Sequence, residues 1–244
     1  MAERIEAASP VTEQVAGRVA GRRRWLVALV ALAALAWALL APPPLPAGGT
    51  RLSAFSPEQL ASLEQAAWEA YYYRQWPRLF WLMLRVMRDQ FGLSWAQALY
   101  AASLNTQAQL IFARQGDQGG AAEAAMRRFY TLVREPLGAG YDPDRAAAAE
   151  LRWWVVHRRR HDYPDSSELV KAMTALYAEV YSLPEAAVEA AARGRVRAVE
   201  VSDQWLDQQQ PAGSPLLRQV RAELLTGYTA LKEALQRRTP VAHP

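Results

Sequence analysis

The chain has 244 residues, of which 51% are hydrophobic, and it carries 28 Lys and Arg against 24 Asp and Glu. An apolar fraction this high excludes a disordered chain, and a net charge of only +4 is too small a positive footprint for nucleic acid, so no nucleic-acid partner is expected. The absence of cysteine excludes disulfides, thiolate metal sites and a cysteine nucleophile.

The first predicted element is an apolar helix near the N-terminus. Residues 25–41 read WLVALVALAALAWALLA, seventeen positions without a polar side chain, which is the lower end of what spans a membrane. Three arginines at 22–24 precede this run, and prolines and glycines follow it. By the positive-inside rule we expect a cytoplasmic Arg-rich segment over 1–24, a single-pass signal anchor over 25–42, and an extracytoplasmic domain beyond the cell membrane.

Three other interpretations of the apolar run stay open. A cleaved signal peptide needs small residues before the cut, but Pro42 follows Ala41, and Leu45 lies two positions before Ala47. The stretch GRRRWLV loosely matches a twin-arginine export signal, although an ordinary flank of arginines looks the same. A buried helix of a soluble protein is the third. An uncleaved anchor fits these residues best.

After a Pro/Gly-rich spacer over 43–55, the chain reads as helices throughout. Good helix formers dominate, and no stretch alternates with a period of two. We therefore expect an all-α domain over 56–238, a bundle of about seven or eight antiparallel helices, followed by a disordered tail over 239–244. The expected helices cover 57–75, 77–90, 94–114, 120–135, 143–161, 165–181, 184–207 and 214–237.

Capping patterns at the helix starts support these boundaries. A serine or aspartate before a first-turn proline, or three residues before a glutamate or glutamine, is typical of a helix N-terminus. The predicted caps are Ser56 with Gln59, Ser94 with Gln97, Asp142 with Pro143, Asp165 with Glu168, Ser182 with Glu185, and Ser214 with Pro215.

The helix expected over 143–161 carries an unusual polar face. At 100° per residue, Glu150, His157 and His161 fall within about 40° of one another. Arg152 falls on the opposite side of the helix, and a side that carries arginine normally faces solvent. The Glu/His face therefore points inward, where carboxylates are seldom found without partners.

Other helices show related anomalies. Asp203 falls within the apolar stripe of the helix expected over 184–207, and Arg195 lies at the edge of that stripe. In the first helix of the domain, Arg74 follows the apolar side and Glu69 lies at its margin. We expect Asp203 to point inward as well, with Arg74 or Arg195 as its charge partner, and Glu69 is a further candidate for the same core cluster.

These residues allow three kinds of core site. A buried ion-pair and hydrogen-bond network that fixes helix register is favoured. A ligand-binding cleft is second. A metal site of Glu150, His157, His161 and Asp203 is disfavoured, because the two histidines have i, i+4 spacing but no pair of Glu-x-x-His motifs accompanies them. The sequence therefore predicts no metal.

Aromatic residues crowd the segment Trp68–Trp81, with seven in fourteen positions. Helical spacing spreads them around the axis, so they cannot all face one core. Neighbouring helices, a protein partner or the lipid interface are the alternatives that would cover them. The expected interaction surface consists of Trp68, Tyr72 and Trp76.

No motif in the sequence indicates a particular reaction. A phosphate-binding loop and a Gly-x-Ser-x-Gly elbow are both absent from the sequence, so no cofactor is predicted and an enzyme is not favoured. The expected function is that of a membrane-anchored extracytoplasmic interaction or accessory module with a protein partner. The alternative is a ligand- or metal-binding helical-bundle enzyme with the Glu/His/Asp cluster in its core.

Overall fold

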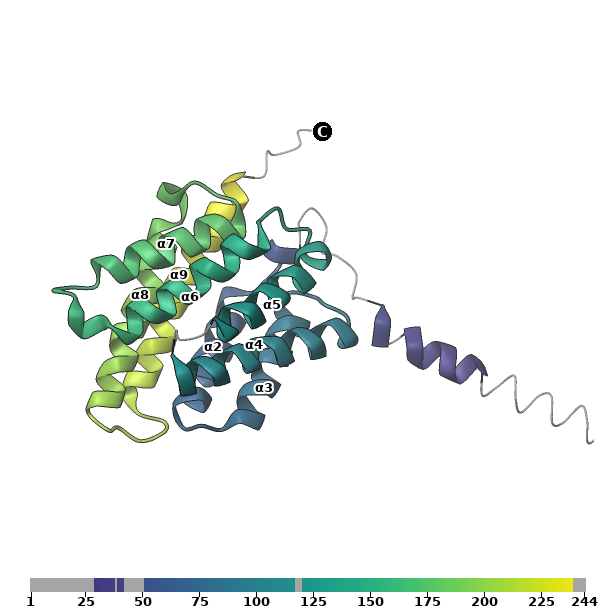
Figure 1. Ribbon diagram of the computed structural model, residues 1–244, viewed down its shortest axis with the longest axis horizontal. Coiled ribbons are helices and arrows are strands. Elements are labelled where there is room, and N and C mark those ends of the chain that lie inside the picture. Colours follow the sequence, from purple (N-terminus) through teal and green to yellow (C-terminus); the bar gives the residue numbers. More distant parts are fainter. Residues whose placement is uncertain (1–28, 38, 42–50, 117–119, 239–244) are drawn as a thin grey trace, which may run out of the picture. The chain divides into compact units, whose positions relative to one another are not determined.

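The computed structural model describes residues 29–37, 39–41, 51–116 and 120–238 of the chain (Figure 1). The chain divides into two units, Met1–Ala41 and Pro42–Pro244. Within the first unit, residues 29–37 and 39–40 are helical, and their large apolar side chains are exposed, Trp37 by 75%. Across the described ranges, no helix combines the length and the apolarity needed to cross a membrane.

Several predicted segments lie outside the described residues. The Arg-rich segment 1–24 and the tail 239–244 lie wholly outside them, as do residues 25–28, 38 and 42 of the expected anchor and 43–50 of the spacer. The membrane anchor over 25–42 therefore stays a prediction.

The described part of the second unit contains helices and no strand, which confirms the predicted all-α fold. A turn of 3-10 helix, η1, precedes the first long helix, a π-helical turn, η2, continues α3, and a second 3-10 turn, η3, follows α6. The elements are η1 (Arg51–Ser53), α2 (Pro57–Tyr72), α3 (Trp76–Arg85), η2 (Val86–Gln90), α4 (Trp95–Gln115), α5 (Ala121–Leu137), α6 (Pro143–Arg158), η3 (Arg160–Asp162), α7 (Ser167–Tyr181), α8 (Glu185–Asp207) and α9 (Pro215–Arg238).

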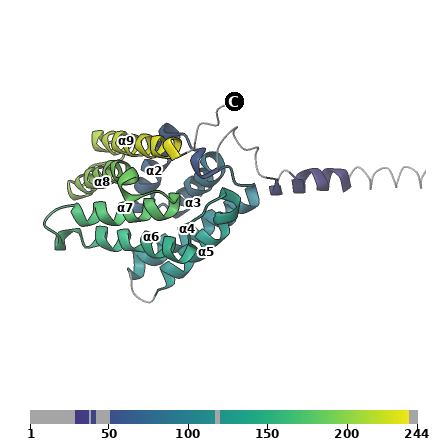
Figure 2. The same ribbon diagram turned by 90° about the horizontal axis from the view of Figure 1, so that it is seen from above.

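The long helices are arranged as a closed ring. Each helix from α2 to α9 packs against the next one in the chain, and α9 packs back against α2. Figure 2 shows α8 and α9 along one side of this ring and α5 and α6 along the opposite side. The predicted antiparallel bundle therefore has an interior onto which every helix can project side chains. Lys232 Nζ of α9 helps to close the ring by donating to the main-chain oxygens of Ser53 and Phe55, at 2.5 and 3.0 Å.

Local sequence explains the starts of α4 and α6. Ser94 and Gln97 form the predicted capping box at α4, with both reciprocal hydrogen bonds present. The Asp142 side chain accepts from two main-chain amides of the first turn of α6, and Pro143 occupies its first position. Such caps satisfy amide groups that the helix itself leaves unpaired.

Three local details differ from the prediction: the end of the first helix, the partner of Ser56 in its capping box, and the role of Ser182. The first helix ends at Tyr72, and Arg74 turns with a φ of 55° into α3. At Ser56 the reciprocal bond comes from Gln90, whose Oε1 accepts from the Ser56 amide. Ser182 caps the C-terminus of α7 with a φ of 51°, and the next helix begins after Pro184.

Helices α8 and α9 cross with their backbones in contact. A Cβ atom built on Gly194 of α8 would lie 2.6 Å from the Cα of Gly227 in α9, and one on Gly227 would lie 3.0 Å from the main-chain oxygen of Ala191. Only glycine allows so close an approach. The crossing fixes the rotation of α8, and thereby the direction in which the following residue, Arg195, projects.

Candidate functional site

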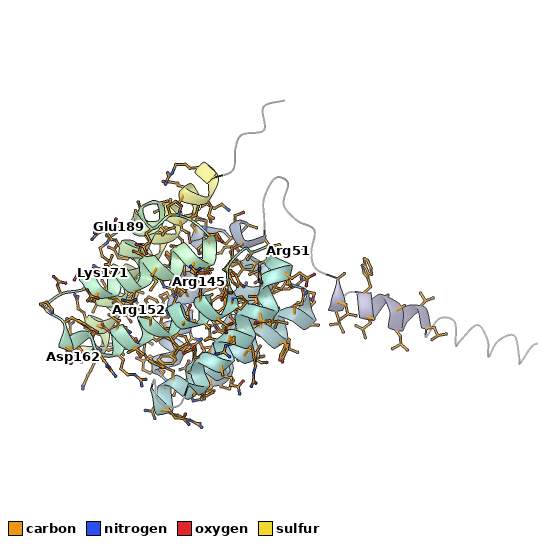
Figure 3. All side chains as sticks on the ribbon, turned by 45° about the horizontal axis from the view of Figure 1, so that its top comes forward. Arg51, Arg145, Arg152, Asp162, Lys171 and Glu189 are labelled. Atoms are coloured by element: carbon orange, nitrogen blue, oxygen red, sulfur yellow. The ribbon has the colours of Figure 1, made fainter. Side chains whose placement is uncertain are left out.

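The ring of helices encloses a cavity of about 430 Å³, and every helix from α2 to α9 contributes to its wall. Most lining side chains are apolar or aromatic, which together with this volume is typical of a small-molecule site. Outward-facing positions differ in character: Arg152 of α6 and Lys171 of α7 project from the surface (Figure 3). The charged or ionisable lining residues, apart from tyrosines, are Glu64, Glu150, His157, Arg158, Arg160, Arg195 and Asp203.

An ion pair between Glu64 of α2 and Arg195 of α8 forms one part of the wall. Arg195 Nη2 contacts Oε1 of Glu64, and the hydroxyl of Tyr228 from α9 donates to Oε2. Arg195 Nη1 donates to the Tyr177 hydroxyl of α7 at 3.3 Å, while its buried Nε has no hydrogen-bond acceptor. The two charged side chains are only 16% and 10% exposed. The pair therefore joins four helices at a place where water does not screen it.

Glu150 of α6 is held differently, by neutral donors alone. Its Oε1 accepts from the indole nitrogens of Trp153 and Trp154, both at 3.0 Å, and its Oε2 accepts from the Tyr130 hydroxyl of α5 at 2.8 Å. Tyr130 is itself positioned by Tyr141, whose hydroxyl donates to its main-chain oxygen at 3.0 Å. These donors orient the carboxylate but do not neutralise its charge.

A third group links α6 to α8 at the cavity wall. His157 Nε2 lies 3.1 Å from both carboxylate oxygens of Asp203, and Arg160 Nε lies 3.1 Å from Oδ2. The His157 ring stacks on Trp153 at 6.2 Å between centroids. Because Trp153 also donates to Glu150 and lies 5.4 Å from the Arg195 guanidinium, it connects the three polar groups.

Burial shifts the pKa values of these groups. Desolvation raises the pKa of Glu64 above its usual value, and the positive charge of Arg195 opposes this effect without cancelling it. Desolvation acts to lower the pKa of Arg195, but the charge of Glu64, together with smaller contributions from Tyr177 and Glu150, outweighs it, so the pKa of Arg195 is raised. Burial and then the charge of Glu150 raise the pKa of Tyr130 well above its usual value. Arg195 is therefore charged, and Tyr130 is neutral, at any physiological pH.

The structure brings together three of the residues that the sequence placed in a core cluster. Glu150, His157 and Asp203 all line the cavity. His161 was wrongly predicted to face inward: α6 ends at Arg158, so the helical angle no longer applies, and His161 is exposed in η3. Glu69 also lies outside the cluster, where it pairs with Arg78 at 3.5 Å.

The predicted charge partners were wrong as well. Arg74 is exposed in the turn between α2 and α3, and Arg195 pairs with Glu64. The arginine that does contact Asp203 is Arg160, which comes from the turn after α6. That turn could not be derived from helical periodicity, because periodicity stops where the helix stops.

The expected aromatic surface is mostly turned toward the interior. Trp68 and Tyr72 are partly buried and line the cavity, and Trp76 packs against Tyr71 with ring centroids 5.9 Å apart. In the described part of the chain, the large aromatics left exposed on the ring lie elsewhere. They are Tyr73, Trp81, Trp95 and Tyr100.

Glu64 is the main site residue that sequence reasoning missed. It lies four residues after Leu60 and three before Ala67, within the buried stripe of α2. The same helical periodicity that indicated Glu150 would therefore have indicated Glu64. Tyr130, Tyr177 and Tyr228 gave no comparable signal, since a tyrosine on an apolar face is common in any helical core.

The charged groups at the cavity wall are not arranged as the predicted metal site. Within the described residues, no three His, Asp or Glu side chains gather as metal ligands would, so the set Glu150, His157, His161 and Asp203 is not assembled. The polar groups that are present already bond one another. What they leave is an apolar and aromatic chamber with charged groups set into its wall.

Comparison of the chain with protein-family models, with curated proteins and with solved structures found no match.

Proposed function

We propose that the helical domain binds a small, largely apolar molecule in the cavity within its ring of helices. The observation that carries this proposal is a volume of about 430 Å³ that stays open although the surrounding core is fully formed. Protein interiors are normally packed without voids of this size, because empty space forfeits dispersion contacts. A space lined by Met87, Phe129 and Trp154 is suited to an apolar body.

Binding without catalysis is the version of this function that the polar groups support. His157 directs Nε2 to Asp203, and Glu150 accepts from three donors, so each group is held in one orientation by its neighbours. Fixed groups of this kind give a ligand its orientation and specificity. The domain would thus act as a carrier or sensor of its ligand.

Filling the cavity tests this function. Ala67 of α2 and Val199 of α8 line it, so Ala67→Leu and Val199→Phe would occupy part of the space. We expect the full chain to enhance the fluorescence of the neutral apolar probe N-phenyl-1-naphthylamine, and each filled variant to bind it at least about tenfold more weakly. The control Ala190→Leu adds the same bulk on the exposed side of α8. Equal probe binding by filled variants and control would contradict the proposal.

We also propose that residues 25–41 hold the domain at a membrane with the N-terminus in the cytoplasm. Support comes from the unbroken apolar run after three arginines and from the exposed leucines at 29, 32 and 35 within it. The test is a reporter fused after His243, which we expect to be active only outside the cytoplasm. Cytoplasmic activity, or release of the chain from membranes by alkaline carbonate, would refute this attachment.

A further inference from the structure

Glu150 is the carboxylate of the cavity wall that no charged group bonds directly. Glu64 and Arg195 form a direct ion pair, and Asp203 lies between His157 and Arg160. Both oxygens of Glu64 accept from charged or hydroxyl donors, as an ionised carboxylate does. Arg195 also interacts electrostatically with Glu150, but its nitrogens bond Glu64 and Tyr177 and none of them bonds Glu150.

The remaining charged lining residue does not neutralise Glu150 either. Arg158 is an exposed residue, and its Nη2 donates to the main-chain oxygen of Phe112 at 2.8 Å while its guanidinium lies over the Phe112 ring. Water screens a charge at such a position. The carboxylate of Glu150, by contrast, contacts only neutral N–H and O–H groups, and a partly buried charge held this way is unfavourable unless a counter-charge completes it.

Glu150 also keeps room for one further donor. A carboxylate offers about four acceptor positions, and Glu150 uses two on Oε1 and one on Oε2. The open position is on Oε2, and Glu150 lines the cavity. A ligand that carries a positively charged N–H group could therefore complete the carboxylate in both charge and hydrogen bonding.

The surrounding side chains suit the rest of such a ligand. Tyr130, Trp153 and Trp154 contact Glu150 directly, and Phe112 packs on Trp154 with ring centroids 5.2 Å apart. Aromatic rings tolerate organic cations better than aliphatic walls do, because their faces carry partial negative charge. Beyond them the wall is apolar, with Val133 and Leu137 among its residues.

We propose that the ligand is a lipophilic amine, bound as its ammonium ion with the nitrogen donating to Glu150 and the apolar body filling the cavity. This inference rests on the proposed binding function and names its ligand class. A carboxylate ligand would add a second negative charge beside Glu150, and a neutral ligand would leave the existing one uncompensated. Three ligands that share one apolar body but carry a positive charge, no charge or a negative charge should therefore differ in affinity.

The test compares 4-phenylbutylamine, 4-phenylbutan-1-ol and 4-phenylbutyrate on the full chain by titration calorimetry. We expect the amine to bind at least about tenfold more tightly than the alcohol, and the carboxylate to bind most weakly. In Glu150→Gln, which keeps the shape and an acceptor oxygen, the amine should lose that advantage while the alcohol binds as before. The control Glu200→Gln removes a charge from an exposed position of α8 and should change none of the three affinities.

The outcomes separate this inference from the function on which it rests. If the three compounds bind equally, or if Glu150→Gln leaves the amine preference intact, the amine assignment is overturned, whereas probe binding that responds to cavity filling would still support the binding function. If the amine does not bind at all, the assignment is overturned as well. Circular dichroism of Glu150→Gln establishes that the variant is folded, and the comparison of compounds on the unmodified chain needs no variant.

Discussion

Helix α8 takes part in two regions that are packed in opposite ways. On one side, Gly194 lets α8 approach α9 until the backbones touch, and no side chain intervenes. On the other side, Arg195 reaches into a wall of charged and aromatic groups around an open cavity. The first region is close-packed and depends on shape alone. The second contains empty space and depends on the ion pairs in the cavity wall.

The difference shows how a helical ring can hold a cavity without collapsing. The α8–α9 crossing fixes where α8 lies, and the ion pair from Arg195 to Glu64 fixes α2 against it. A purely apolar cavity would gain by closing, because closure restores dispersion contacts. Closure here would have to displace hydrogen-bonded charged groups, which is costly in a low-dielectric interior.

Breaking the Glu64–Arg195 pair should have the largest effect on this balance. In Arg195→Met the carboxylate of Glu64 loses its counter-charge inside the core, so we expect a loss of about 3–5 kcal/mol in the free energy of unfolding. Denaturant unfolding measures it. The control Arg193→Met, which breaks only an exposed i, i+4 pair with Glu189, should cost less than about 1 kcal/mol.

The same variant should show a defined pH dependence. Burial already raises the pKa of Glu64, and removal of the Arg195 charge that opposes this shift raises it further. A carboxyl group whose pKa is raised in the folded state favours folding at low pH and loses that contribution as pH rises through the folded-state pKa. The deficit of Arg195→Met should therefore shrink as pH falls from neutral toward the ordinary range of a glutamate. A deficit that grows on acidification would show that the pair is not the cause.

Widening the glycine crossing should have the next largest effect. Gly194→Ala places a Cβ in contact with the backbone of α9, and overpacking of this kind costs about 1–3 kcal/mol. In an exposed helix the same substitution would instead stabilise by up to about 1 kcal/mol. The sign of the change in stability, measured by thermal or denaturant unfolding, therefore decides between the two. Ala190→Gly, on the exposed side of α8, measures the difference in helix propensity between alanine and glycine.

Asp203→Asn should have a smaller effect, because the side chains that contact Asp203 are partly exposed. The change keeps the shape but weakens the contacts to His157 and Arg160, whose side chains are 17% and 31% exposed. We expect about 1–2 kcal/mol in denaturant unfolding. Asp207→Asn, 65% exposed and 3.7 Å from Arg160, is the matched control and should stay within about 0.5 kcal/mol. Equal losses in both variants would show that the contacts of Asp203 in the cavity wall contribute no more to stability than the exposed contact of Asp207.

The smallest effect should come from Glu69, the carboxylate that lies outside the cavity. Its partner Arg78 is 45% exposed and 3.5 Å away, so Arg78→Ala should change the free energy of unfolding by about 0.5 kcal/mol or less. A loss above about 1.5 kcal/mol would mean that this ion pair contributes to stability as much as the groups in the cavity wall.

Helix positions could be predicted from the sequence because caps and breakers act within a few residues. The starts of α4 and α6 followed from Ser94 and Asp142, and the inward face of α6 followed from periodicity as far as His157. Periodicity failed at His161, since the chain had left the helix by then.

Partners across the ring could not be predicted, because they depend on which helices become neighbours. Arg195 was expected to meet Asp203, which lies on its own helix, yet it meets Glu64 from α2. The cavity itself has no signature in the sequence. It results from side chains of eight helices that do not meet in the middle, and the sequence pattern of a single helix does not show that gap.

The closure of the ring by α9 has a consequence for the order of events during synthesis. Tyr228 completes the environment of Glu64 from a position 164 residues later in the chain, and α2 packs directly on α9. A nascent chain therefore lacks the hydroxyl that donates to Oε2 of Glu64 until its last helix has left the ribosome. The cavity is thus among the last parts of the protein to be completed, and a product that stops before Pro215 lacks the part of its wall that Tyr228 forms.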